Sequence, residues 1–303
     1  MIVAENLSKD FGARHAVADA SFTVRPGRVT GFLGPNGAGK STTMRMIVGL
    51  DRPTGGHVTV DGHSYASMRA PLTEVGVLLD AKAVHTGRSA TNHLRAMAAT
   101  HGIPRSRVDE VIEITGLGSV ARKRAGGFSL GMGQRLGIAA ALLGDPHTLI
   151  LDEPVNGLDP EGVMWVRRFV RQAAAEGRTV LLSSHLMSEM AVTADHIIVL
   201  GRGRVLADAS VGDIVSQWTR HSVHVRSPQA GALAEALAGE GITITSVETG
   251  VLEIAGIDAA AVGDLAARAG ITLHELTPTS GTLEDAYLRL TGDDVEYKTK
   301  DIA

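Results

Sequence analysis

The sequence contains no cysteine. This absence excludes a disulfide framework, a thiolate zinc site and a cysteine nucleophile. No apolar run approaches the roughly 20 residues that cross a bilayer, and the longest, residues 136–144, is rich in Gly and Ala and suits a packed helix. The formal net charge is only −4, which is small and of the wrong sign for a dedicated nucleic-acid binder. We therefore expect no nucleic-acid partner.

The first five residues lack a basic region followed by an apolar core. We therefore expect no signal peptide and a cytoplasmic chain, so any membrane role must come through a partner. With 303 residues, the chain can hold one large domain or two modest ones and can bury a full core.

Residues 34–41 fit the pattern G-x-x-x-x-G-K-S/T. The glycines of this pattern let backbone N–H groups surround a phosphate. Lys40 adds a mobile charge for the outer phosphates, and the Ser41 hydroxyl can hold Mg²⁺. An apolar run at 29–33 precedes the stretch and a helical run at 42–48 follows it, so the helix N-terminus points at the anion. The alternative is a glycine-rich strand-to-helix turn. The order of strand, loop and helix favours a nucleotide site built from Gly34, Pro35, Asn36, Gly37, Ala38, Gly39, Lys40, Ser41 and Thr42.

Short β-branched runs alternate with helical stretches up to about residue 215, a pattern typical of a largely parallel sheet covered by helices. With the phosphate loop, this predicts an α/β fold with a P-loop NTPase core over residues 1–218. Runs near residues 2–3 and 22–24 predict a small antiparallel β flap. Strand signals vanish between about 82 and 145, where helical spacing predicts a helical insertion with helices at 92–101, 105–116 and 133–143.

The tail, residues 219–303, shows the order strand, helix, strand, strand, helix, strand. This order predicts a small α+β ferredoxin-like domain, with elements at 222–226, 230–239, 242–246, 251–254, 259–269 and 271–276. A last helix at 283–290 precedes a charged end that we expect to be frayed. We interpret the tail as a regulatory or dimerising accessory domain.

An apolar run at 149–151 ends in Asp152 and Glu153. An Asp at the end of a buried strand can hold Mg²⁺ through water beside a phosphate loop. The adjacent Glu can accept a proton from an attacking water. The alternative is a strand end followed by a charged turn.

Residues 128–135 open another helix. Ser129 is a natural N-cap and Gly131 allows close approach, so this is a second possible anion-binding helix end, with a plain capped helix as the alternative. Here the chain resembles the ATP-binding subunit of ABC transporters, whose signature reads Leu-Ser-Gly-Gly-Gln shortly before a Gln-Arg pair. The matching residues are Ser129, Gly131, Gln134 and Arg135, whereas Phe128, Leu130 and Met132 depart from the pattern. The resemblance covers about residues 1–215, and residues 281–287 look like the tail of drug and antibiotic exporters.

Further residues fall where that family places functional ones. Phe11 looks like the aromatic that stacks on adenine, with a packed core aromatic as the alternative. Asp159 lies in a segment similar to the family's D-loop, which crosses the dimer interface; the alternative is an Asn-Gly turn that caps the next helix. His185 looks like the switch histidine that contacts the γ-phosphate, rather than a solvated loop residue. Asp80 stands where the family usually has a glutamine, and its carboxylate can still bind Mg²⁺.

The resemblance implies an ATP-hydrolysing subunit that uses ATP and Mg²⁺ to energise export of a drug-like or lipid-like compound. It implies a separate integral-membrane permease, docked beside residues 80–100 at the cytoplasmic face of the membrane. It also implies a head-to-tail homodimer in which each ATP touches the phosphate loop of one chain and Ser129 and Gly131 of the other. The implied catalytic residues are Lys40, Glu153 and His185, and the implied metal ligands are Ser41, Asp80 and Asp152.

Two alternatives remain open at this point. One is a soluble ABC-type ATPase that acts on nucleic acid or ribosomes, although the chain lacks the second cassette, long coiled coil or basic insertions of such proteins. The other is a nucleotide-gated regulatory module that binds ATP without turnover. The presence of Lys40, Glu153 and His185 argues against this module.

Overall fold

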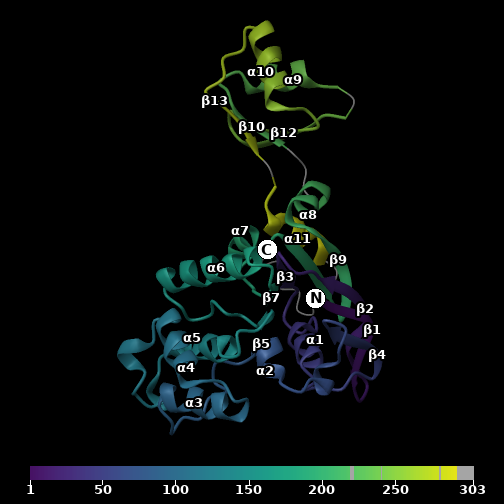
Figure 1. Cartoon of the computed structure of the whole chain (residues 1–303). Helices are drawn as coiled ribbons and strands as arrows, with labels where there is room; N and C mark the ends of the chain where they lie inside the picture. Colours follow the sequence, from purple (N-terminus) through teal and green to yellow (C-terminus); the bar gives the residue numbers. More distant parts are fainter. Residues whose placement is uncertain (219–221, 240, 280, 292–303) are drawn as a thin grey trace. The chain divides into compact units, whose positions relative to one another are not determined.

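The structure is a computed structural model that describes residues 1–218, 222–239, 241–279 and 281–291 (Figure 1). Its contacts group the described residues into two compact units, one made of Met1–Val211 with Thr291 and the other lying within Gly212–Leu290. The boundary predicted from the sequence falls at 218/219, and residue 219 and the charged end after residue 291 lie outside the described residues. Within those residues, no helix combines the length and the apolar composition that a bilayer-spanning segment requires.

The first unit is built on a six-stranded sheet in the order β5-β6-β7-β3-β8-β9. The parallel strands of this sheet are β5 (Val75–Leu78), β6 (Thr148–Leu151), β7 (Thr179–Ser183), β3 (Val29–Leu33) and β8 (His196–Gly201), while β9 (Arg204–Ser210) runs antiparallel to β8. Every residue of β3, β6 and β7 is buried, as expected for central parallel strands covered on both faces. The carboxyl ends of these strands meet at one edge of the sheet, which positions the site.

The predicted helical insertion lies between β5 and β6. Its helices gather beside β5, on the side away from the antiparallel flap (Figure 1). The helices of the first unit are α1 (Lys40–Ile47), α2 (Pro71–Glu74), α3 (Ala90–Thr100), α4 (Arg105–Ile114), α5 (Leu130–Leu142), α6 (Pro160–Ala175) and α7 (Met187–Thr193), with 3₁₀ turns at Tyr65–Ser67, Gly118–Val120 and Ala125–Gly127.

A three-stranded antiparallel sheet in the order β2-β1-β4 forms the predicted flap. It consists of β1 (Ile2–Phe11), β2 (Arg14–Val24) and β4 (Gly55–Val60), and Ile2 pairs with Val24 on one side and with Val60 on the other. Its apolar side chains join those of α1 and the large sheet in one hydrophobic cluster. This shared core fixes the flap, and Phe11 at the end of β1, relative to the phosphate loop.

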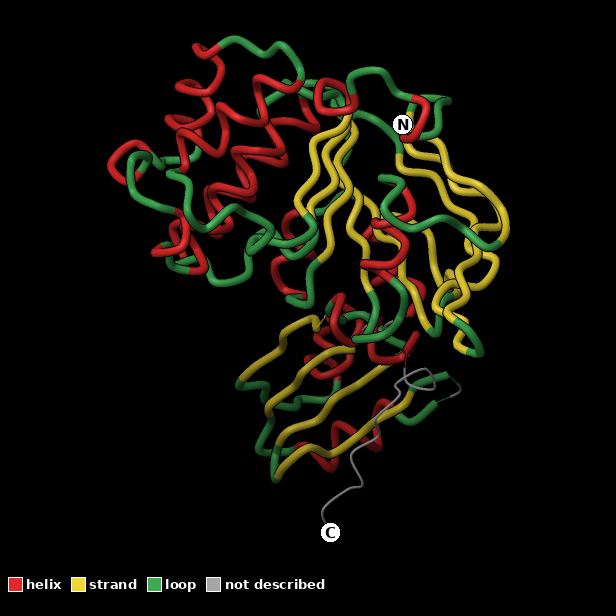
Figure 2. The backbone as a smooth tube through the Cα atoms, turned by 90° about the horizontal axis from the view of Figure 1, so that it is seen from below, coloured by secondary structure: helices red, strands yellow, loops and turns green. Residues whose placement is uncertain are grey.

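The second unit is an antiparallel sheet in the order β11-β12-β10-β13 (Figure 2). Its elements are α8 (Val211–Trp218), β10 (Ser222–Arg226), α9 (Ala230–Leu237), β11 (Thr243–Glu248), β12 (Val251–Ala255), α10 (Ala259–Arg268), β13 (Glu275–Thr279) and α11 (Leu283–Thr291). Apolar residues of α9 and α10 form a core with alternate residues of the strands. The mixed α/β class predicted from the sequence is confirmed, with the split β-α-β arrangement in this unit.

The last predicted strand is misplaced, because β13 covers Glu275–Thr279 and not residues 271–276. Gly270 ends α10 with a φ of +67°, and the Ile271 N–H donates to the Ala266 carbonyl at 2.9 Å, which continues the helix cap. Pro278 weakens the strand pattern, yet β13 is an edge strand, where proline is tolerated. The sequence prediction also omits β9.

Candidate active site

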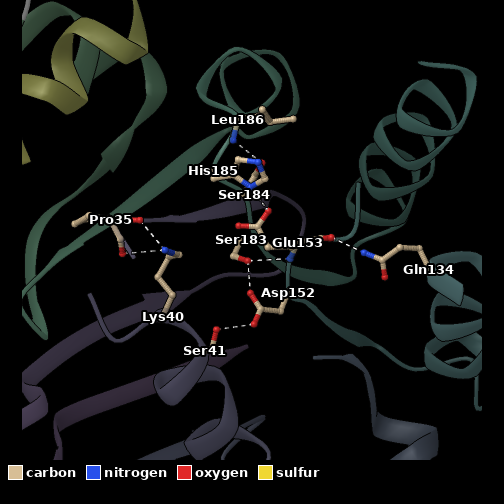
Figure 3. A network of polar contacts seen from close by, with 11 residues as sticks. Pro35, Lys40, Ser41, Gln134, Asp152, Glu153, Ser183, Ser184, His185 and Leu186 are labelled. Carbon is tan, nitrogen blue, oxygen red and sulfur yellow. Dashed lines mark hydrogen bonds and ion pairs between the residues drawn. The ribbon is translucent and has the colours of Figure 1, made fainter. Parts of the chain in front are cut away.

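Polar side chains from three segments converge at the carboxyl edge of the parallel sheet (Figure 3). Lys40 and Ser41 follow β3, Asp152 and Glu153 follow β6, and His185 follows β7. Because the strand order places β7 between β6 and β3, residues more than 100 positions apart in the sequence come into hydrogen-bonding contact.

The phosphate loop approaches the flap too closely for side chains. Gly39 has a φ of +102°, and a Cβ on it would lie 2.5 Å from the Ala16 carbonyl oxygen. Gly39 also provides no side-chain cap for α1, so the first N–H groups of the helix are left for a ligand. A pocket of about 330 Å³ opens over this loop, and its lining residues are Phe11, Arg14, Ala16, Asn36, Gly37, Ala38, Gly39, Lys40, Ser41 and Thr42. The loop geometry suits an anion.

Lys40 is held inside the loop by backbone oxygens. Its Nζ donates to the Gly34 carbonyl at 2.6 Å and to the Pro35 carbonyl at 3.2 Å. Burial lowers the pKa of Lys40, and the carboxylates of Glu153 and Asp152 act in the opposite direction. A phosphate oxygen would be a stronger partner for the ammonium than these neutral carbonyls are.

Two serines hold the Asp152 carboxylate. Ser41 Oγ donates to Asp152 Oδ2 at 2.8 Å, and Ser183 Oγ donates to Asp152 Oδ1 at 2.5 Å. Among the described residues, no group of three or more His, Asp or Glu side chains could hold a metal ion. The adjacent hydroxyl and carboxylate oxygens of Ser41 and Asp152 fit Mg²⁺, which is bound by few protein oxygens and completes its shell with water and phosphate.

Glu153 is fixed in an unusual backbone conformation. Its φ is +50°, a region that non-glycine residues rarely adopt and that costs on the order of 1–3 kcal/mol. The Glu153 N–H donates to Ser183 Oγ at 3.0 Å, and Gln134 Nε2 donates to the Glu153 carbonyl at 2.7 Å. His185 Nδ1 lies 2.7 Å from Glu153 Oε2. The surroundings therefore hold both the backbone and the carboxylate of Glu153 (Figure 3).

Phe11 lies beside the loop and not in the core. It ends β1, the residue is 51% exposed, and Lys9 Nζ lies 4.9 Å from the ring centroid. Phe11 lines the loop pocket together with Arg14, which pairs with it across the turn between β1 and β2. An exposed ring at this place can stack on a base. Arg14 was not among the residues predicted from the sequence, although its position opposite Phe11 across a Gly12-containing turn was a usable signal.

The other predicted nucleotide-binding residues do not line this pocket. Ser129 N-caps α5, with its Oγ accepting from the Met132 N–H at 3.3 Å. Asp159 N-caps α6, with Oδ1 accepting from the Gly162 N–H at 3.0 Å. A Cβ on Gly131 would lie 2.9 Å from the Gly157 carbonyl oxygen, so the first turn of α5 packs against the loop that leads to Asp159.

The structure leaves Asp80 out of the polar network. Its exposed carboxylate accepts from the Lys82 N–H at 2.8 Å and thereby caps its own turn. No hydrogen bond joins it to Ser41 or Asp152 in the described part of the chain. Its role as a metal ligand stays a prediction.

Two further residues belong to the network but were not among the predicted site residues. Ser183, fully buried at the end of β7, joins Asp152 to the Glu153 amide, and buried Gln134 reaches the Glu153 carbonyl. A hydroxyl closing an apolar strand two residues before His185 was a signal for the first. The Gln-Arg pair after the signature was a signal for the second.

Comparisons with known proteins show which proteins this chain resembles. A family model described as ABC transporter matches residues 17–156, and a model described as a domain of unknown function matches residues 221–284. The chain is 35% identical over 297 residues to the uncharacterized ABC transporter ATP-binding protein YhcH of Bacillus subtilis (strain 168), with 96% of each chain covered. It is 33% identical over 300 residues to the bacitracin transport ATP-binding protein BcrA of Bacillus licheniformis, with 96% of this chain and 97% of BcrA covered.

The fold comparison leads to the same family. A solved structure described as the ATP binding subunit of an ABC transporter superposes with a TM-score of 0.66 at 28% identity, and covers 72% of this chain and 92% of its own. The relatives that are 33–35% identical match over 96% of this chain, and the phosphate loop, the Ser129 helix and the Asp152–Glu153 pair occur in the expected order. The chain belongs to the family of ABC transporter ATP-binding proteins.

Proposed function

We propose that this chain is the ATP-hydrolysing subunit of an exporter, and that it energises the export of a drug-like or lipid-like compound through a separate membrane permease at the cytoplasmic face. The observation that carries the proposal is the network of Lys40, Ser41, Asp152, Glu153 and His185 at one sheet edge, in a chain similar over its length to BcrA. BcrA is described as a bacitracin transport protein, which favours an exporter of antibiotic-like compounds.

Phosphate binding is the first task of the site. The open N–H groups of α1 and the ammonium of Lys40 face an anion held in the loop pocket, and Phe11 supports the base. Ser41 and Asp152 would hold Mg²⁺, which supplies positive charge to the phosphates when bound. In phosphoryl transfer, positioning and charge provide most of the catalysis.

Glu153 is the proposed general base for the attacking water. A carboxylate within hydrogen-bond reach of that water accepts its proton as the new P–O bond forms. His185 holds one carboxylate oxygen at 2.7 Å, which orients the other oxygen for the water. Ser183 and Gln134 hold the Glu153 backbone, so the carboxylate starts from a fixed position.

We propose further that the working form is a head-to-tail homodimer with two ATP molecules between the chains. The loop pocket is lined by residues 11–42 alone, and the capped N-terminus of α5 at Ser129 is left with N–H groups for another ligand. In this arrangement Ser129 and Gly131 contact the nucleotide held by the partner chain, and Asp159 lies at the interface between the chains.

A positively charged surface on the helical insertion supports docking to the permease. Residues 81–108 contain no Asp or Glu, and the stretches 86–89 and 124–126 run side by side through hydrogen bonds such as Ala125 N–H to the Arg88 carbonyl, at 2.9 Å. We call this region the basic surface. Its exposed cations form no ion pair within the described residues, and they are Lys82, Arg88, Arg122, Lys123 and Arg124. This surface adjoins the expected docking segment at 80–100 and favours an acidic segment of the permease.

Co-purification tests the proposed function. We expect the tagged full chain, expressed in the cells that naturally produce it, to recover an integral-membrane protein from detergent-solubilised membranes. Replacing Arg122, Lys123 and Arg124 together with Glu should lower the recovery about tenfold or more, because like charges would then face each other. ATP hydrolysis by the purified variant should stay at the parental level.

The matched control carries Glu at three other exposed arginines, Arg25, Arg204 and Arg268, which changes the charge equally. This control should recover the membrane protein like the parent. Absence of any membrane protein from the parental preparation would count against the transporter role. Equal recovery by both triple variants would count against the basic surface as the docking site.

A further inference from the structure

Gln134 is a buried polar side chain with a specific partner. The residue is only 4% exposed, and its Nε2 donates to the Glu153 carbonyl at 2.7 Å (Figure 3). Its Oε1 has no hydrogen-bond donor within the described residues. A buried amide that leaves one acceptor unsatisfied lowers stability, so the fold alone gives little reason for a glutamine here.

The partner carbonyl belongs to a residue with a constrained backbone. Glu153 has a φ of +50° and precedes Pro154, which further restricts its conformations. Its carbonyl also accepts from the Asn156 N–H at 3.1 Å, so it keeps a donor if Gln134 is removed. The Glu153 carbonyl therefore does not need Gln134 as a hydrogen-bond donor. The bond from Gln134 instead sets the orientation of the Glu153 peptide.

The helix that carries Gln134 begins at the second phosphate-binding end. Ser129 caps α5, and Gly131 in its first turn lies too close to the Gly157 carbonyl for any side chain. The first turn of α5 is therefore tightly packed against the loop after Glu153. A small movement of the Ser129 end is transmitted along α5 to Gln134, since a packed helix moves as a unit.

We infer that Gln134 is a positioning residue that couples the two ATP sites of the dimer. This inference rests on the proposed head-to-tail arrangement, in which Ser129 of one chain contacts the nucleotide bound by its partner, while Glu153 acts on the nucleotide of its own chain. The bond from Gln134 to Glu153 then links occupation of one site to the alignment of the base in the other. Each ATP prepares the hydrolysis of its neighbour.

Kinetics of a Gln134→Met variant of the full chain test this coupling. Methionine has a similar volume and lacks the donor, and it also removes the unsatisfied Oε1, so the melting temperature should stay within about 3 °C of the parent. Turnover should fall about tenfold, the value of one lost hydrogen bond to the backbone that positions the base. The Hill coefficient for ATP should fall from a parental value approaching about 2 to about 1.

Single-chain binding of ATP provides the first control. Gln134 does not line the loop pocket, so the Kd for ATP, measured below the concentration at which dimers form, should change less than about twofold. A Gln172→Met variant is the matched control, because Gln172 is an exposed glutamine whose Nε2 donates to Glu176 Oε1 at 3.0 Å. It should keep both the parental turnover and the parental Hill coefficient.

Several results would overturn the inference. A Gln134→Met variant with parental turnover and cooperativity would remove any role for the bond. Lower turnover with an unchanged Hill coefficient would show that Gln134 acts only within its own site, and a parental Hill coefficient of 1 would leave no coupling to explain. A parent that neither hydrolyses ATP nor dimerises with it would overturn the proposed function, and the inference with it.

Discussion

Replacing Glu153 with Gln is expected to lower ATP turnover about 10²–10⁴-fold, the usual contribution of a general base. The amide keeps the size of the carboxylate and an oxygen that still accepts from His185, so the site keeps its shape. It cannot take a proton from water. ATP binding should therefore persist, and the unhydrolysed nucleotide should trap the dimer.

Phosphate release measures the expected loss of turnover, and equilibrium binding measures whether the variant still binds ATP. A Glu113→Gln variant is the control, because this exposed carboxylate on α4 lies outside the polar network and its loss should leave turnover unchanged. Hydrolysis by the Glu153→Gln variant at the parental rate would show that another group is the base.

Replacing Lys40 with Met is expected to weaken ATP binding without lowering the stability of the free protein. The ammonium contributes charge-assisted hydrogen bonds to the phosphates, each about 1.5–3 kcal/mol, so the Kd for ATP should rise about 100-fold or more. The free protein should unfold at an equal or higher urea concentration. Burial lowers the pKa of Lys40, which means that the folded protein holds the charged form at a cost that methionine does not have.

Isothermal titration and urea unfolding at pH 7 check both effects of this substitution. A Lys123→Met variant, which removes an exposed cation that does not line the loop pocket, should change neither quantity. Parental affinity in the Lys40→Met variant would contradict the phosphate-binding role. A large loss of stability would show that the ammonium stabilises the free loop through the Gly34 and Pro35 carbonyls.

The parts of the site that are local in sequence were predictable. The loop from Gly34 to Ser41 and the pair Asp152–Glu153 each combine their chemistry with an adjacent apolar strand, so residue type and context occur together. The parallel sheet, the flap and the helical insertion were predictable for the same reason, since each strand or helix carries its own periodicity. The fold comparison confirms this architecture.

The contacts between these parts were not predictable. Ser183 meets Asp152 because β7 lies between β6 and β3, and no single strand encodes that order. Gln134 reaches the Glu153 carbonyl only through the packing of α5 against the loop after β6. Arg14 joins the loop pocket through the register of the flap. Strand order, packing and register arise from the whole chain, so single motifs do not reveal them.

Asp80 is the reverse case, because the motif order predicted a role that the polar network does not include. The strand β5 ends next to β6, and the Asp152 N–H donates to the Leu78 carbonyl at 2.7 Å, so the backbone near Asp80 is close to the site. The short side chain turns back to the Lys82 N–H instead. A longer glutamine would reach further.

The most direct test of the proposed shared ATP site is sedimentation of two variants with ATP and Mg²⁺. Glu153→Gln alone should sediment as a dimer of two 31.6-kDa chains. Adding Ser129→Asp keeps a good N-cap for α5 but places a negative charge at the helix end that we propose to face the partner's phosphates. The double variant should bind ATP with the affinity of the single variant and remain monomeric. An ATP-dependent dimer of equal stability in both variants would contradict a site completed by Ser129 of a second chain.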